Sequence, residues 1–153
     1  MADTVSREQR SRNMAAIRSK DTKPEVYLRK LLWKQGLRYR LHDKKIPGKP
    51  DIYFPKYRTA VFVNGCFWHR HENCRYAYMP KSNQEFWQQK FDRNMTRDRQ
   101  VSQQLKELGI HRIVVWECEI NSMKKDPDRE KEMISRLIHE IKEKRDQDEQ
   151  QHF

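Results

Sequence analysis

The chain has 153 residues, of which 35% are hydrophobic, and its 33 Lys and Arg outnumber 22 Asp and Glu to give a formal net charge of +11. This length and composition predict one domain with a modest core, and no apolar run approaches the roughly 20 residues of a membrane helix. The charge favours a polyanion as partner, nucleic acid above all, although a basic isoelectric point also occurs in proteins that only need to stay soluble.

The first residues, Met1 to Asn13, are polar and charged rather than typical of a targeting segment, so we expect a cytoplasmic protein. Residues 1–20 have little apolar content and five cationic side chains, which are Arg7, Arg10, Arg12, Arg18 and Lys20. We interpret them as a basic N-terminal arm that orders on a phosphate backbone. A disordered leader is the simpler alternative.

A helix is predicted to begin at Thr22, which can cap it, with Pro24 in the first turn. It should end near Gly36 and bury an apolar face made of Val26, Leu28, Leu31 and Leu32. Three extended runs follow, at residues 37–41, 51–54 and 59–63, and the last is typical of a central strand.

The pattern Ser82-x-x-Glu85, a capping box, predicts a long helix that stops at Gly109. Its apolar residues available for burial are Phe86, Trp87, Phe91, Leu105 and Leu108. Asn94 and Asp98 fall on the face of Trp87, Phe91 and Leu105, where polar groups need partners. A basic stripe lies beside that face and consists of Lys90, Arg93 and Arg97.

A strand over residues 111–116 and an amphipathic helix that starts at Asp126-Pro127 complete the predicted elements. The apolar side of that helix consists of Met133, Ile134, Leu137, Ile138 and Ile141. This order predicts a mixed α/β fold, in which helices flank a small sheet, as a single domain over residues 21–142. Residues 143–153 are expected to form a disordered tail.

The three cysteines of the chain are Cys66, Cys74 and Cys118. Cys66 and Cys74 flank His71 on the loop that leaves the central strand, and Cys118 ends a later apolar run. Together they make a tetrahedral Cys3His set for a structural zinc ion that staples the loop to the sheet. His69 competes for the fourth position, because spacing alone does not separate it from His71. Three free cytosolic thiols are the alternative.

Asp51 is the candidate ligand for a second metal ion. Hard oxygen ligands suit Mg²⁺, and its place at the second extended run brings it near the end of the central strand. The alternative is an Asp that only caps a turn after Pro50, a common role for this residue.

Several short motifs span residues 11–118. They are Ser11-Arg12-Asn13-Met14, Asp21-Thr22-x-x-Glu25, Pro47-Gly48-Lys49-Pro50-Asp51, Gly65-Cys66-Phe67-Trp68-His69-x-His71, Glu85-Phe86-Trp87, Asn94-x-x-Arg97-Asp98 and Trp116-Glu117-Cys118. In content and order they resemble the motifs of the very short patch repair (Vsr) DNA mismatch endonucleases. Beyond Ser122 no motif contributes to this resemblance.

The resemblance implies a restriction-endonuclease-like (PD-(D/E)xK-related) fold and a Mg²⁺-dependent nuclease that nicks double-stranded DNA 5′ of the mispaired T in a T:G mismatch. It makes Asp51 and the backbone carbonyl of Val63 the magnesium ligands and His69 the general base or the group that orients the water. Glu25 would complete the acidic surroundings of the metal, although it is also the N3 residue of a capping box. A metal ion stabilises charge on the reacting phosphate, and an imidazole relays a proton near neutral pH.

The resemblance also implies that Phe67, Trp68 and Trp87 insert beside the mismatch from the major groove and that Met14 wedges from the minor groove. A mismatched pair costs less to unstack than a matched pair, which itself provides selectivity. Trp87 could instead be a core residue. Further DNA contacts are expected from Lys90, Asn94 and Arg97.

The chain departs from the family pattern before Gly65, where Val63 and Asn64 replace a polar residue and a histidine. A backbone carbonyl survives the first change, and Asn64 can hydrogen-bond a phosphate or water at the catalytic site but cannot exchange a proton at neutral pH. One extra residue between His71 and Cys74 is compatible with zinc binding but alters the loop that would meet flanking bases.

Two other functions remain open from the sequence. One is a noncatalytic, zinc-stapled DNA-binding module, which would leave Asp51 and His69 without a role. The other is a nuclease of the same fold without mismatch preference. No dimer seam is evident, so we expect a monomer of bacterial type that is associated with the nucleoid when bound to DNA. Contacts with other mismatch-repair proteins are not readable from the sequence.

Overall fold

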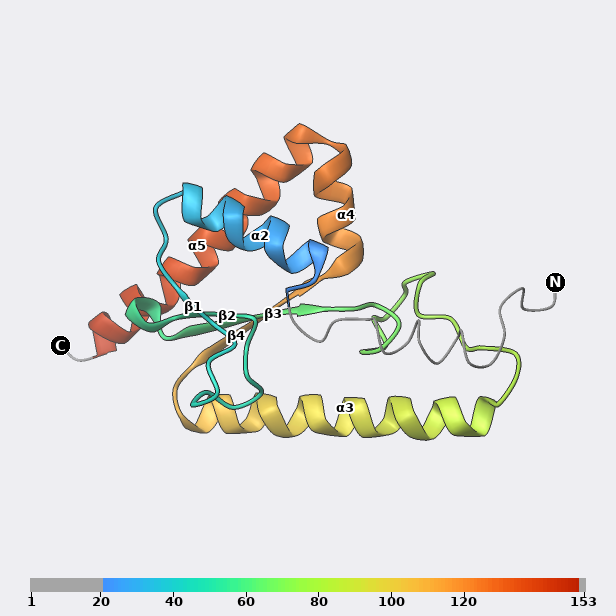
Figure 1. Cartoon of the computed structure of the whole chain (residues 1–153). Helices are drawn as coiled ribbons and strands as arrows, with labels where there is room; N and C mark the ends of the chain where they lie inside the picture. Colours follow the sequence, from blue (N-terminus) through green and yellow to red (C-terminus); the bar gives the residue numbers. More distant parts are fainter. Residues whose placement is uncertain (1–20, 152–153) are drawn as a thin grey trace.

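The computed structural model describes residues 21–151, with side chains as far as residue 143. Its elements are α2 (Lys23–Lys34), β1 (Arg40–Leu41), β2 (Ile52–Phe54), the 3-10 turn η1 (Pro55–Tyr57), β3 (Thr59–Asn64), α3 (Gln84–Glu107), β4 (His111–Trp116), α4 (Glu117–Lys125) and α5 (Pro127–Gln151). The strands form one sheet, which α2, α4 and α5 cover on one face and α3 covers on the other (Figure 1). This confirms the mixed α/β architecture.

The sheet has the order β1-β2-β3-β4. β1, β2 and β3 pair antiparallel, with Ile52 opposite Val61, whereas β3 and β4 pair parallel, with Val63 opposite Val115. Parallel neighbours need a crossover connection, and α3 supplies it. The N-terminal half of α3 projects beyond the sheet, beside the loop that follows β3 (Figure 1).

The larger core lies between the sheet and the layer of α2, α4 and α5. The buried side chains of that core include Leu28, Leu32, Ile52, Phe54, Val61, Ile113, Val115, Ile120, Met123, Ile134, Leu137 and Ile141. A smaller core under α3 consists of Tyr53, Ala60, Leu105 and Ile110. Burial of such apolar side chains from water fixes how the helices dock on the sheet.

Most predicted elements are confirmed. The Thr22 hydroxyl caps α2 by accepting a hydrogen bond from the Glu25 N–H at 3.4 Å, and Pro24 lies in the first turn. Leu28 and Leu32 of the predicted apolar face are buried. The predicted apolar side of the last helix packs into the larger core.

The structure corrects the start of the long helix. α3 begins at Gln84, and Asn83 precedes it in a left-handed conformation (φ 56°) without a side-chain cap. The predicted capping box at Ser82 does not form, because Asn tolerates this backbone conformation and turns the chain one residue later. Phe86 and Leu108, which were available for burial, are 58% and 50% exposed.

Three further elements differ from prediction. The extended run at 37–41 yields only the two-residue strand β1. α4 was not predicted, because its buried residues Ile120 and Met123 form a single i, i+3 pair, which is too short to establish a helical period. α5 continues to Gln151, through most of the segment that was predicted to be disordered.

The basic arm, residues 1–20, lies outside the described residues, as do residues 152 and 153. The single domain over residues 21–142 therefore stays a prediction. Among the described helices, none combines the length and the apolar character that a membrane span requires.

Candidate active site and metal centre

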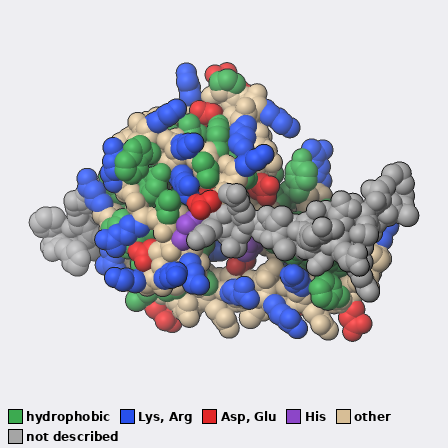
Figure 2. Space-filling model, viewed as in Figure 1, with side chains coloured by type: hydrophobic (Ala, Val, Ile, Leu, Met, Phe, Trp, Pro, Cys, Tyr) green, Lys and Arg blue, Asp and Glu red, His purple; other side chains and the backbone are tan. Residues whose placement is uncertain are grey.

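A cleft of about 930 Å³ opens between the end of β3, the turn before β2 and α3. Its acidic and imidazole lining comes from Asp51, Asp98, His42, His69 and Glu117. Its cationic lining comes from Lys44, Lys49, Arg97 and Arg112. On this face of the molecule, Lys and Arg side chains lie around visible histidine atoms (Figure 2). The cleft therefore combines a positive border, suited to phosphates, with carboxylates suited to a cation.

Asp51 and Val63 meet at the edge of the cleft. Asp51 Oδ2 accepts a hydrogen bond from the Val63 N–H at 2.7 Å. Continuing the register of β2 and β3 places Pro50 opposite Val63, and proline has no N–H to offer the Val63 carbonyl. The N–H and C=O of an extended residue point to the same side, so this carbonyl also faces Asp51. Burial raises the pKa of the Asp51 carboxyl.

His69 is oriented by α3. Its Nδ1 lies 2.8 Å from Asp98 Oδ2, and Asn94, one helical turn before Asp98, donates from Nδ2 to the Trp68 carbonyl at 3.1 Å. In the neutral imidazole, the contact with Asp98 places the ring proton on Nδ1 and leaves Nε2 as an acceptor. The sequence predicted that both polar residues of this helix face would have partners, and this is confirmed.

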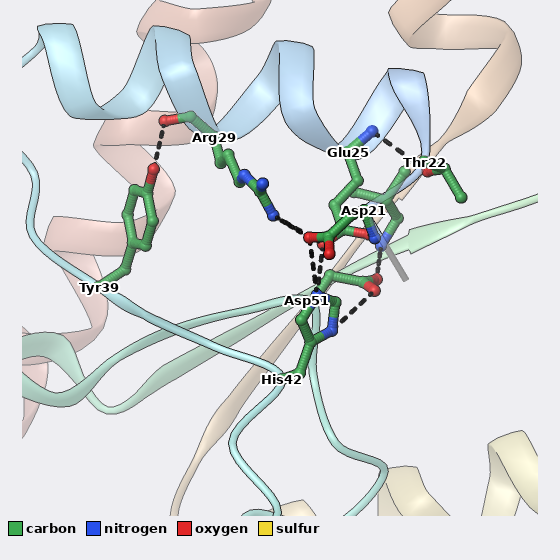
Figure 3. A network of polar contacts seen from close by, with 8 residues as sticks. Asp21, Thr22, Glu25, Arg29, Tyr39, His42 and Asp51 are labelled. Carbon is green, nitrogen blue, oxygen red and sulfur yellow. Dashed lines mark hydrogen bonds and ion pairs between the residues drawn. The ribbon is translucent and has the colours of Figure 1, made fainter. Parts of the chain in front are cut away.

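Glu25 is 1% exposed and belongs to a polar network with Arg29 on α2, His42 after β1, and Asp51 (Figure 3). Its Oε1 lies 2.8 Å from His42 Nε2 and 3.3 Å from an Arg29 nitrogen, and its Oε2 accepts from the Asp21 N–H at 3.0 Å. Burial, together with the charge of Asp51, raises the pKa of Glu25. The Glu25 carboxylate therefore bonds to the Asp21 N–H rather than to the Thr22 N–H of a capping box, and it faces other charged groups.

The sulfur atoms of Cys66, Cys74 and Cys118 and a ring nitrogen of His71 all lie within 4.8 Å of one another. A tetrahedral zinc ion with Zn–S bonds of about 2.3 Å needs its ligand atoms roughly 3.8 Å apart, so this cluster fits one metal ion. His71 stacks on Trp116 at 4.1 Å between ring centroids. His69 is engaged with Asp98, so His71 takes the fourth position.

The parallel register of β3 and β4 explains this cluster. Asn64 is opposite Trp116, and the same offset relates Cys66 to Cys118, two residues beyond the strand ends. Burial, and then the neighbouring Cys66, raises the pKa of the Cys118 thiol to about 12. Three thiolates this close need a cation to balance their charge.

An aromatic cluster joins the loop after β3 to the projecting half of α3. Phe67 lies 5.1 Å from Trp68, 5.5 Å from Trp87 and 5.1 Å from the buried Phe91, measured between ring centroids. Lys90 Nζ lies 5.0 Å from the Trp68 ring. Phe67, Trp68 and Trp87 are half-buried rather than core residues. Met14 lies outside the described residues.

Comparison with known proteins identifies the family of the chain. The family model for DNA mismatch endonuclease Vsr matches residues 2–75. The DNA mismatch endonuclease Vsr of Escherichia coli (strain K12) is 42% identical over 125 residues, which cover 82% of this chain and 80% of that protein. The chain belongs to the Vsr family of DNA mismatch endonucleases.

Two other relatives of this Vsr-family endonuclease are named nicking enzymes. The type II nicking enzyme V.NmeAIP of Neisseria meningitidis serogroup A is 46% identical over 143 residues, or 94% of this chain and 99% of the relative. The type II nicking enzyme V.XorIIP of Xanthomonas oryzae pv. oryzae is 44% identical over 123 residues, or 80% and 90%. The chain is thus an endonuclease that acts on DNA.

Sequence reasoning missed two groups of this Vsr-family site. Asp98 was recognised as an inward polar residue and as part of a family motif, but not as the partner of His69, which lies 29 positions away. His42 carried no signal, since it is a lone histidine in a turn, yet it lies between Glu25 and Asp51. Local spacing does not encode such contacts.

Proposed function

We propose that this endonuclease uses Mg²⁺ to nick one strand of double-stranded DNA on the 5′ side of the mispaired T in a T:G mismatch, and so initiates very short patch repair. The observation that carries the proposal is the convergence of Asp51, the Val63 carbonyl and His69 in a cleft bordered by cations, beside an aromatic cluster.

Asp51 and the Val63 carbonyl would hold the magnesium ion. Both offer hard oxygen atoms, and a buried carboxylate with a raised pKa gains from a nearby cation. When bound, Mg²⁺ stabilises the charge that develops on the reacting phosphate and acidifies bound water. Glu25 would add a further negative charge behind this site.

His69 would act as the general base. Its Nε2 accepts a proton from the attacking water while Asp98 holds the ring through Nδ1 and stabilises the imidazolium that results. Asn64 is buried and lines the same cleft, where its amide can hydrogen-bond the water or a phosphate oxygen.

Mismatch selectivity would come from the aromatic cluster. Trp68 lines the cleft, and Phe67 and Trp87 lie behind it on the same side. Insertion of these rings from the major groove, with Met14 from the minor groove, costs less at a mismatched pair than at a stacked one. Lys90 and Arg97 would contact phosphates. The Asn94 amide, which donates to the Trp68 carbonyl, would act by holding the loop.

We propose that the metal of the cysteine cluster is zinc, since three thiolates and one imidazole in a closed tetrahedral set are typical of structural zinc. We further propose a restriction-endonuclease-like fold, action as a monomer, and a place in the bacterial cytoplasm at the nucleoid. The family membership decides against a noncatalytic DNA-binding module. A nuclease without mismatch preference is the second candidate.

The test uses duplexes that are identical except for one T:G in place of a T:A, with varied flanking bases, incubated with the full chain and Mg²⁺. Breaks are mapped at nucleotide resolution. A single nick 5′ of the mispaired T, absent from the matched duplex, is expected. Equal cleavage of both duplexes would favour the second candidate, and cleavage by Asp51→Ala would overturn the metal assignment.

A further inference from the structure

His42 occupies a position between two acidic groups that come from different elements. It follows β1 directly and has a left-handed backbone (φ 48°), which directs its side chain into the polar network (Figure 3). Its Nε2 lies 2.8 Å from Glu25 Oε1 and 3.5 Å from Asp21 Oδ1, and its Nδ1 lies 4.0 Å from Asp51 Oδ1. His42 therefore contacts Glu25 on α2 and faces Asp51 at the start of β2.

The charges around His42 indicate the role of its imidazole. Asp21, Glu25 and Asp51 bring three carboxylates together, and Arg29 pairs with Asp21 at 2.7 Å and with Glu25 at 3.3 Å. Neither of these contacts extends to Asp51. Buried like charges repel one another, and an imidazole between Glu25 and Asp51 separates them without filling the cleft.

The Nε2 atom of His42 is shielded from solvent, but in spite of the 2.8 Å separation it makes no hydrogen bond of regular geometry with Glu25. A buried polar atom in this state costs free energy and is found where function uses it.

A metal ion held by Asp21, Glu25 and His42 is the competing explanation, since their ligand atoms lie within 4.8 Å of one another. Arg29 decides against it. Its guanidinium already contacts one oxygen of each acid, Asp21 Oδ1 and Glu25 Oε1, and a second positive charge beside it would be repelled.

We propose that His42 is a positioning residue of the cleavage site, whose Nε2, 2.8 Å from Glu25 Oε1, holds the Glu25 carboxylate behind Asp51 so that its negative charge supports the magnesium ion held by Asp51. This inference rests on the proposed metal-dependent nuclease. Because His42 acts through Glu25 and not on the DNA, its loss should lower the affinity for the cation and leave the affinity for DNA unchanged.

The test compares His42→Ala, His42→Gln and His42→Asn. The Gln amide nitrogen reaches about as far as Nε2, whereas the shorter Asn amide corresponds to Nδ1. Cation affinity is measured by Mn²⁺ titration with electron paramagnetic resonance in the presence of duplex DNA, alongside the Mg²⁺ concentration for half-maximal nicking. His139→Ala is the matched control, because His139 is 80% exposed on α5.

In His42→Ala we expect cation affinity to fall about 10–100-fold, the range seen when partners of metal ligands are removed, with metal-free DNA affinity unchanged. The half-maximal Mg²⁺ concentration should rise more than the rate at saturating Mg²⁺ falls. His42→Gln should restore cation affinity to within about threefold of wild type, and His42→Asn should not.

Two results would overturn the role of His42. In one, the cation affinity of His42→Ala equals that of His139→Ala, although the wild-type protein nicks DNA and Asp51→Asn does not. In the other, Asn restores cation affinity and Gln fails, which would place the important contact at Asp51. If His42→Ala does not fold, the cation affinities of His42→Gln and His42→Asn still test the role of His42. Failure of the proposed function has a different signature, since wild type would then show no cation-dependent nicking, or Asp51→Asn would retain it.

Discussion

His69 Nδ1 and Asp98 Oδ2 lie 2.8 Å apart, although one residue leaves the sheet on a loop and the other is on the long helix beneath it. Both side chains are about 30% exposed (31% and 29%), so the pair is open to the cleft. The carboxylate fixes the orientation of the imidazole ring at the edge of the cleft.

We expect Asp98→Ala to slow nicking by about 10–100-fold at saturating Mg²⁺, because His69 loses the group that orients its ring. Single-turnover nicking of a T:G duplex measures this effect. Asp92→Ala is the control, since Asp92 is an exposed carboxylate of the same helix. An equal loss in both variants would show that the helix as a whole, and not the contact with His69, was affected.

Asp51→Asn should raise the stability of the metal-free cleft at neutral pH. Burial raises the pKa of Asp51 in the folded chain, so its favourable contribution is present below the pKa of the unfolded chain and is lost as pH rises through the folded value. A neutral amide avoids this loss, and we expect a gain of about 0.5–2 kcal/mol at pH 7.5.

Thermal unfolding without added divalent cations, over a pH series, checks this prediction. The difference between Asp51→Asn and wild type should shrink at acid pH, as the carboxyl becomes protonated in both states. A variant that is less stable than wild type at pH 7.5 would contradict the sign of the effect.

The two histidines of the loop, His69 and His71, should differ in their effect on the zinc content of the protein. We expect about one zinc per chain in wild type, its loss in His71→Ala and Cys66→Ser, and its retention in His69→Ala, because only His71 lies within the cysteine cluster. Loss of zinc should lower the unfolding free energy by roughly several kcal/mol. An intact wild-type fold without metal would refute the structural role.

Gly48→Ala should destabilise the turn that leads to Asp51. Gly48 has φ +80°, and an added Cβ would lie 2.6 Å from Val101 Cγ1 and 3.0 Å from Phe62 Cε1. We expect a loss of about 1–3 kcal/mol from this overpacking and the backbone strain.

Gly36→Ala is the matched control for Gly48→Ala. Gly36 has a similar φ of +90°, but an added Cβ meets no atom within 4 Å. Chemical denaturation of both variants separates the steric cost from the backbone cost. Equal losses would mean that the turn can move away from α3 without penalty.

The locally encoded features of the structure were predictable from the sequence. The Thr22 cap, the helical period of α5 and the alternation of strands and helices depend on residues within a few positions of one another. Where local signals were too short, as in α4, or competed with a left-handed residue, as at Asn83, prediction failed. The exposed Phe86 shows that apolar character alone does not determine burial.

By itself, the sequence determined the element types, the motifs of the family and the three cysteines of the metal cluster, because these depend on residue types and their order along the chain. Only the tertiary structure decided that His71 rather than His69 joins them, that Asp98 lies beside His69 and that His42 lies between Glu25 and Asp51. These contacts depend on the parallel register of β3 and β4 and on how α2 and α3 dock on the sheet. Both are set by burial of the whole core rather than by any local pattern.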